Sequence, residues 1–162
     1  MPAHPVPSAG RFAGRRMLTA ALLLACALSG ALVAQASWEL PGLGGGSLSS
    51  NDVASGTTVM VVFAGWSPHC ADVVERTNAL AGRLGGRARV VMVDFQEEPA
   101  EVSAFLEGKG ARSAVYLDPD GAFSKQHRVV TLPGMVVYRD GAVTFQGKLP
   151  RDPESVVGAG RR

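Results

Sequence analysis

The strand-turn-helix segment that ends at Cys70 constrains the fold more than any other part of the sequence. Residues 59–64 are apolar at every position, which predicts a β-strand buried on both faces, as in a parallel sheet covered by helices. Ser67 stands where a helix N-cap belongs, and Pro68 stands at the first helical position, where its missing N–H costs nothing. Cys70 then falls at the third helical position, near the positive end of the helix dipole.

Strand and helix patterns alternate through the rest of the chain and predict an α/β fold. Apolar runs predict strands at 88–95, 113–117, 134–138 and 142–146, and three-and-four spacing predicts helices at 67–84, 98–107, 122–127 and 151–157. The Gly- and Ser-rich segment 37–56 indicates a short hairpin or loop that leads into the sheet, with a flexible tether as the alternative. We therefore expect a mixed central sheet flanked by helices.

The first 36 residues have the order of an export signal. Arg11, Arg15 and Arg16 precede an apolar run at 17–34, and a small-x-small sequence, Ala-Gln-Ala, follows at 34–36. The run is long enough to span a bilayer, so residues 1–36 are either a cleaved signal peptide or an N-terminal apolar helix that anchors the protein. A lipoprotein site at Cys26 and a twin-arginine signal are weaker alternatives. Residues 37–162 then form one exported domain in a periplasmic or other extracytoplasmic compartment.

Charge and cysteine content narrow the function. The formal net charge is +2 and falls near neutral without the three leader arginines, so we expect no nucleic-acid partner. After the leader only Cys70 remains. In an oxidising compartment this thiol has no partner within its own chain.

Trp66-Ser67-Pro68-His69-Cys70 resembles the Trp-Cys-x-x-Cys site of the thioredoxin superfamily, with serine in place of the first cysteine. The chain is most similar to membrane-anchored bacterial thioredoxin-like thiol:disulfide interchange proteins. Three further stretches resemble that family: the Leu-Pro-Gly-Leu-Gly-Gly segment at 40–45 with Ser-Leu at 47–48, an inserted helix and strand at 98–117, and the turn at 118–121. The resemblance implies a thioredoxin-like fold over about residues 37–157, with Pro133 as a cis-proline facing the active site.

The resemblance also limits the chemistry. In the family the first cysteine is the nucleophile and the second resolves the mixed disulfide. Ser67, at the position of the lost cysteine, forms no disulfide, so the catalytic residue left is Cys70, with at most monothiol exchange on protein or peptide thiols and disulfides. Val61 stands where cytosolic relatives keep a buried acid. The alternative interpretation of Cys70 is a buried, inert side chain.

A binding module is the alternative function. In the family an extended peptide pairs with the backbone before the cis-proline, which is strand addition without sulfur chemistry. The resemblance implies Trp66, Pro68, His69, Leu132 and Pro133 as residues that bind the substrate. This module would need no reactive thiol.

Two further hypotheses have less support. The Ser67-x-x-Cys70 spacing resembles peroxiredoxins, but Phe63 occupies the position where those sites have a proline. A metal site built from His69, Cys70 and His127 lacks a ligand spacing that would support it. We therefore expect no metal and no cofactor. A membrane is a partner only if the N-terminal segment is not cleaved.

Overall fold

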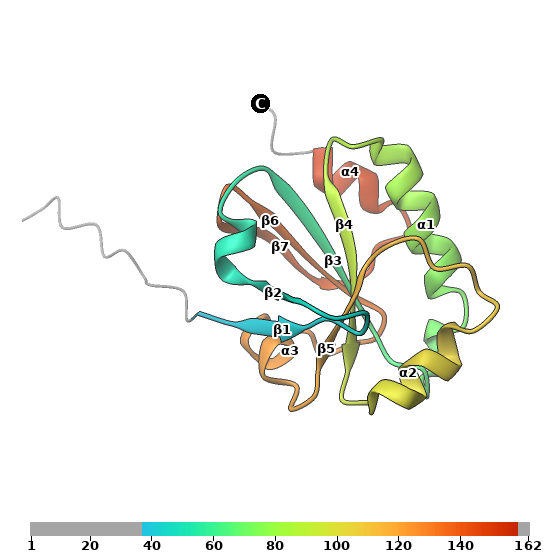
Figure 1. The fold of residues 1–162 in the computed structure, drawn as a ribbon. Coiled ribbons are helices and arrows are strands. Elements are labelled where there is room, and N and C mark those ends of the chain that lie inside the picture. The colour runs from blue at the N-terminus through green and yellow to red at the C-terminus, as the bar shows by residue number, and fades with distance from the viewer. Residues whose placement is uncertain (1–36, 159–162) are drawn as a thin grey trace, which may run out of the picture. The chain divides into compact units, whose positions relative to one another are not determined.

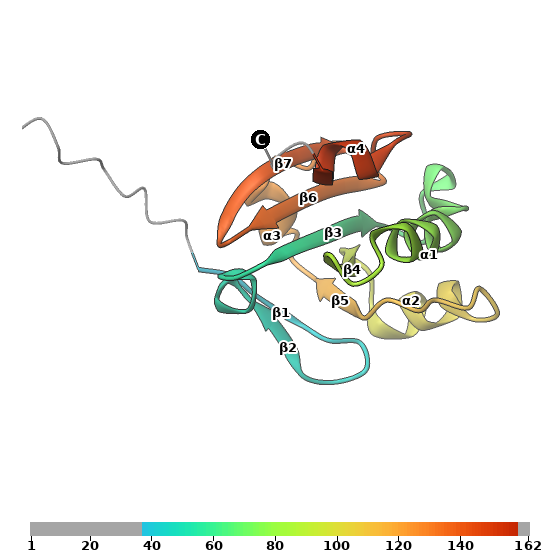
Figure 2. The ribbon, with the colours of Figure 1, turned by 90° about the horizontal axis from the view of Figure 1, so that it is seen from above.

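The computed structural model describes residues 37–158 (Figures 1 and 2). The strands are β1 (Glu39–Pro41), β2 (Ser47–Ser49), β3 (Thr57–Phe63), β4 (Arg89–Phe95), β5 (Val115–Asp118), β6 (Gly134–Arg139) and β7 (Ala142–Lys148). The α-helices are α1 (Val73–Leu84), α2 (Pro99–Leu106), α3 (Ala122–Gln126) and α4 (Pro153–Gly158), and the 3-10 helices are η1 (Ser50–Val53) and η2 (Pro68–Cys70). The predicted leader or N-terminal apolar helix lies outside the described residues.

The sheet is mixed, as the sequence predicts. Its five strands run in the order β5-β4-β3-β6-β7, with β3, β4 and β5 parallel and β6 antiparallel to both β3 and β7. The segment at 37–56 forms the predicted hairpin, in which β1 and β2 pair, and this hairpin contacts the edge strand β5 through a bridge between Gly42 and Tyr116. Within the described residues, no helix is both long and apolar enough to cross a bilayer.

Strand β3 is buried on both faces, which confirms the expectation for residues 59–64. Val59, Val61 and Phe63 belong to a core on the side of α1, α2 and α4, whereas Met60 and Val62 belong to a second core beneath the hairpin and α3. The helices lie on these two sides in Figure 1. The strand thus places the loop that follows it at the carboxyl edge of the sheet, between two packed layers.

The prediction of one unbroken helix from Ser67 to Leu84 is wrong for its first turn. Residues Pro68–Cys70 form a 3-10 turn, and α1 begins only at Val73 after Asp72. The Ala71 N–H bonds to the Pro68 carbonyl, the short spacing of a 3-10 turn. Cys70 therefore lies in a separate turn ahead of the α-helix. Other predicted elements are present, with their ends displaced by one or two residues in most cases.

A buried polar network joins the hairpin to β6. The Trp38 Nε1–H donates to the Tyr138 hydroxyl at 2.9 Å, and that hydroxyl also contacts His127 Nε2. His127 Nδ1 lies 2.8 Å from the Phe123 carbonyl oxygen. Because that oxygen only accepts, Nδ1 carries the ring proton and Nε2 accepts from Tyr138. Burial lowers the pKa of His127, so the neutral ring is the form that fits this network.

His127 is expected to make the fold less stable in acid. Since the folded pKa is lowered, the unfolded chain binds this proton first, and the contribution is lost as pH falls below about 6.5. We expect the stability difference between wild type and His127→Gln, measured by urea unfolding, to shrink from about pH 7.5 to about pH 5.5. A difference that stays constant over this range would contradict the prediction.

Candidate functional site

A groove at the carboxyl edge of β3 brings together segments far apart in the sequence. The loop after β3, the segment 129–133 before β6 and the end of β7 surround a cavity of about 680 Å³. Its lining is Trp66, Ser67, His69, Arg76, Phe95, Val129, Val130, Thr131, Leu132, Pro133 and Lys148. Four of the five residues predicted to bind the substrate are among these. The fifth, Pro68, is exposed but does not line the groove.

The groove has an exposed apolar rim. Trp66 is 63% exposed and Val130 is 88% exposed, and they are the large apolar side chains of the described residues that lie open to solvent. Exposed apolar side chains gathered around one concave site are typical of a binding surface. Trp66 is therefore placed to contact a ligand, and it does not act as a packed core residue.

Cys70 lies beneath this surface. Its side chain is fully buried and belongs to the apolar core next to α1, and it does not line the groove. Burial raises the pKa of the Cys70 thiol, although hydrogen bonding from the Ala64 backbone and the Ser67 side chain partly offsets this. The thiol is thus both covered and mostly protonated near neutral pH.

Ser67 does not cap the helix through its side chain. Its backbone has the extended conformation of an N-cap, but its hydroxyl makes no capping bond. Hydrogen bonding from the Ser67 side chain lowers the pKa of the Cys70 thiol, although the effect of burial is larger. Ser67 therefore occupies the predicted N-cap position, but its side chain adds no capping hydrogen bond there.

The segment that precedes β6 presents free backbone to the groove. The Leu132–Pro133 bond is cis, in agreement with the expectation for Pro133, and the Pro133 carbonyl accepts from Leu149 N–H at 2.9 Å. Within residues 37–158, the backbone groups of residues 130–132 take part in no helix, strand or turn hydrogen bond. Their N–H and C=O groups are therefore available to an extended ligand.

Two carboxyl groups that the sequence analysis missed lie behind the loop. Asp94 is fully buried on β4 beside Phe63 of β3. Its Oδ2 accepts from Glu97 N–H at 3.1 Å, whereas its Oδ1 has no hydrogen-bond partner in the described structure. Burial, together with the nearby Glu97 carboxyl, raises the pKa of Asp94 to about 8. Glu97 in turn accepts from the N–H of Gly65, which directly precedes Trp66, so the pair is linked to the groove loop.

Gly65 has no room for a side chain. A Cβ there would lie 3.0 Å from both the Glu97 carboxylate and the Phe105 side chain, and Phe105 packs on Phe63 with ring centroids 5.6 Å apart. Phe63, which stands where peroxiredoxins have a proline, is thus part of the buried core. Val61 is also fully buried, and its side chain has no titratable group that could transfer a proton.

The three histidine and cysteine candidates do not meet at one point. His69 is exposed and lines the groove, Cys70 is buried beneath it, and His127 belongs to the network with Tyr138. Across residues 37–158, no group of His, Cys, Asp and Glu side chains is arranged to hold a metal ion.

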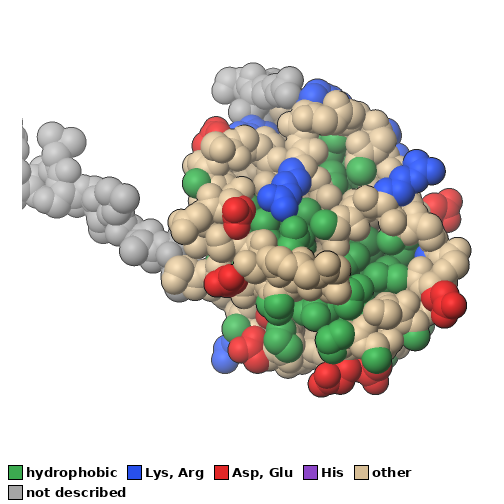
Figure 3. All heavy atoms as spheres, viewed as in Figure 1, with side chains coloured by type: hydrophobic (Ala, Val, Ile, Leu, Met, Phe, Trp, Pro, Cys, Tyr) green, Lys and Arg blue, Asp and Glu red, His purple; other side chains and the backbone are tan. Residues whose placement is uncertain are grey.

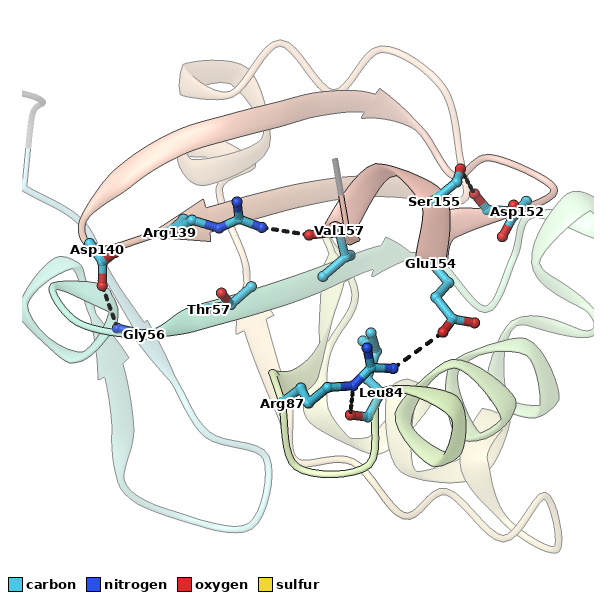
Figure 4. Close-up of a pocket in the computed structure, with 11 residues that line it drawn as sticks. Gly56, Thr57, Leu84, Arg87, Arg139, Asp140, Asp152, Glu154, Ser155 and Val157 are labelled. Carbon is cyan, nitrogen blue, oxygen red and sulfur yellow. Dashed lines mark hydrogen bonds and ion pairs between the residues drawn. The ribbon is translucent and has the colours of Figure 1, made fainter. Parts of the chain in front are cut away.

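A second cavity of about 660 Å³ lies between α4 and the β3–β6 side of the sheet (Figure 4). Its polar groups bond to one another: Arg139 donates to the Val157 carbonyl, Arg87 donates to Glu154 at 3.2 Å, and Asp140 accepts from Gly56 N–H at 2.9 Å. These groups already have partners. Their contacts hold α4 against the sheet and leave few free polar groups for a ligand.

Comparison with solved structures shows the same fold in thiol-disulfide proteins. The exposed lipoprotein thioredoxin Etrx1 of Streptococcus pneumoniae has 18% identity and a TM-score of 0.66, with 76% of this chain and 97% of that chain covered. A secreted Mycobacterium tuberculosis disulfide oxidoreductase homologous to E. coli DsbE has 16% identity and a TM-score of 0.62, with 74% and 94% covered. A thioredoxin-like protein of Aeropyrum pernix has 19% identity and a TM-score of 0.63, with 76% and 89% covered.

A search of curated proteins finds no match. Comparison with protein families finds a match to the AhpC/TSA family over residues 34–146, which is most of the chain. The matched range includes the Trp66–Cys70 segment and the cis-proline. The chain therefore belongs to the AhpC/TSA family and has a thioredoxin-like fold.

Proposed function

We propose that this protein is an exported member of the thiol:disulfide oxidoreductase class that binds extended peptides in the groove at Trp66, with chemistry limited to single-thiol exchange through Cys70. One observation carries this proposal. The groove is lined by Trp66, Leu132 and Pro133, whereas the thiol that would react is buried and does not line it. Recognition is therefore available without a reactive sulfur.

The peptide binds by strand addition. The backbone of residues 130–132 has free N–H and C=O groups, so an extended peptide pairs with it and gains main-chain hydrogen bonds that do not depend on sequence. Trp66 and Leu132 give an apolar contact for one side chain of the peptide. Contacts of an exposed tryptophan commonly supply a large share of the binding energy at such surfaces.

Exchange through Cys70 is a one-sulfur reaction. The Cys70 thiolate attacks a disulfide of the bound protein, forms a mixed disulfide with one sulfur and releases the other as a thiolate. A second thiol from outside the chain must then reduce the mixed disulfide, because Ser67 has no sulfur to do so. Burial of Cys70 and its raised pKa make the first step slow.

Export is supported by the order of the N-terminal residues. Basic residues, an apolar run and a small-x-small sequence follow one another ahead of the domain. Among the solved structures with this fold, one is described as secreted and another as an exposed lipoprotein. Whether the leader is cleaved or anchors the protein in the membrane is tested by the size of the protein recovered in membrane and soluble fractions.

Trp66→Ala is expected to weaken peptide binding at least about tenfold, since it removes the largest exposed apolar contact of the groove. Cys70→Ala is expected to leave binding within about twofold of wild type, because the thiol does not face the groove. The measurement is isothermal titration of cysteine-free peptides, first selected on an array with the full-length wild-type chain. Binding that depends on Cys70 and not on Trp66 would contradict the proposal.

A further inference from the structure

The groove is basic although the domain as a whole is close to neutral. Three of the 16 Lys and Arg residues, namely Arg11, Arg15 and Arg16, belong to the leader, which leaves 13 basic side chains against 14 Asp and Glu residues in the domain. The basic character of the groove therefore does not come from a general excess of positive charge. Acidic side chains gather along the margin where α2 lies in Figure 3. The groove lining, in contrast, includes His69, Arg76 and Lys148 and has no acidic side chain.

Lys148 is the free charge of the groove. It is exposed, and within residues 37–158 its side chain has no ion pair or hydrogen bond. In the β6–β7 pairing it lies opposite Gly134, directly after Pro133. Lys148 of β7 therefore lies beside the end of the segment 130–132, whose backbone is free to pair with a peptide.

Arg76 supplies a second charge that is held in position. Its Nη2 donates to the Pro150 carbonyl at 3.2 Å, which fixes the side chain along the groove wall. Its ion pair with Asp72 is 4.0 Å long, and the Asp72 side chain is 61% exposed. Exposed pairs of this kind are weak, so the Arg76 guanidinium remains available to pair with a carboxylate of a ligand. A smaller cavity next to it is lined by Arg76, Arg83 and Arg151, of which Arg83 is paired with Glu154 at 3.4 Å.

We propose that the groove selects an acidic extended peptide, with an apolar side chain at Trp66 and Leu132 and carboxylates beside Lys148 and Arg76. This inference rests on the proposed function and adds the substrate class. A positive lining without acidic side chains attracts acidic peptides to the groove in preference to neutral or basic ones, and it orients the bound strand. The apolar rim and the free backbone favour a polypeptide over a nucleic acid.

The test uses the full-length chain and three peptides with the same apolar centre, flanked by glutamate, glutamine or lysine. The glutamate peptide is expected to bind about fivefold more tightly than the glutamine peptide and more tightly still than the lysine peptide at low ionic strength. This preference should fall as salt rises toward about 1 M, where charges are screened beyond roughly 3 Å. Lys148→Glu should abolish the preference for the glutamate peptide, because the new carboxylate balances the charge of Arg76. Lys125→Glu, the same change at an exposed position on α3 outside the groove, should leave it unchanged.

The outcomes separate the two levels of the proposal. Equal, Trp66-dependent binding of all three peptides would overturn the acidic preference and leave the proposed function standing. Failure of every peptide to bind, with the chain folded, would overturn both. Equal loss of the preference in Lys148→Glu and Lys125→Glu would assign it to the overall charge of the domain and would overturn the role of the groove. If a single-stranded oligonucleotide binds as tightly as the glutamate peptide, the groove recognises negative charge in general, and the proposal of an acidic peptide is overturned.

Discussion

Asp94→Asn is expected to raise the stability of the fold by about 2–4 kcal/mol at about pH 9. The wild-type carboxyl is fully buried, and its pKa of about 8 means that it ionises in the folded state only in alkaline solution. An unpaired buried anion is costly. Asparagine carries no charge, and its oxygen can still accept the hydrogen bond that Glu97 N–H donates to Asp94 Oδ2.

The pH dependence distinguishes this effect from a general change in packing. Because the folded pKa is raised above the unfolded value of about 4, the wild-type contribution is fully present below pH 4 and is lost as pH rises toward 8. The gain from Asp94→Asn should therefore grow from about pH 4 to about pH 8 in urea unfolding experiments. Glu107→Gln removes an equal charge at an exposed position at the end of α2 and serves as the control. A gain that is independent of pH, or equal in the control, would contradict the account.

Ser67→Cys is expected to create dithiol activity, raising the rate of insulin disulfide reduction at least about tenfold over wild type. The Cys70 N–H bonds to the Ser67 carbonyl at 2.9 Å, so the two residues lie on the same turn of chain. The introduced cysteine therefore lies one turn from Cys70 and lines the groove. Attack by the introduced thiolate gives a mixed disulfide that Cys70 resolves internally, so no outside thiol is needed for that step.

The matched control is the double variant Ser67→Cys with Cys70→Ala, which keeps the entry thiol and removes the resolving one. It should form mixed disulfides with insulin and show little turnover. A folded Ser67→Cys variant that forms the internal disulfide and still fails to reduce insulin would show that the site has lost more than one sulfur.

The fold could be predicted from local patterns because its central elements are simple in sequence. Residues 59–64 are apolar throughout because both faces of β3 are covered. The turn at Asp140-Gly141 has positive φ at both residues, as its sequence predicts for a tight hairpin. The break between η2 and α1 was not predictable in this way, because Ala71 and Asp72 fit the helical spacing and only the backbone shows the interruption.

The candidate site could be predicted only in part, and only through its motif. Trp66, His69, Leu132 and Pro133 do line one groove, yet spacing gives no sign that Arg76 and Lys148 join them from other elements. Asp94 could have been singled out from the sequence, because it is an acidic residue within an otherwise apolar strand at 90–95. Its link to Gly65 through Glu97 depends on how β3 and β4 pair, which a single sequence does not give.

The two tryptophans of the chain sit in opposite surroundings, Trp66 in solvent at the groove and Trp38 at 9% exposure against Phe123, with ring centroids 5.0 Å apart. Indole emission shifts with the polarity around it, so each ring gives a separate optical signal. Light emitted at longer wavelength reports on what occupies the groove, and the shorter-wavelength component reports on whether the hairpin is still docked. The native chain can thus be followed in both respects without any added dye.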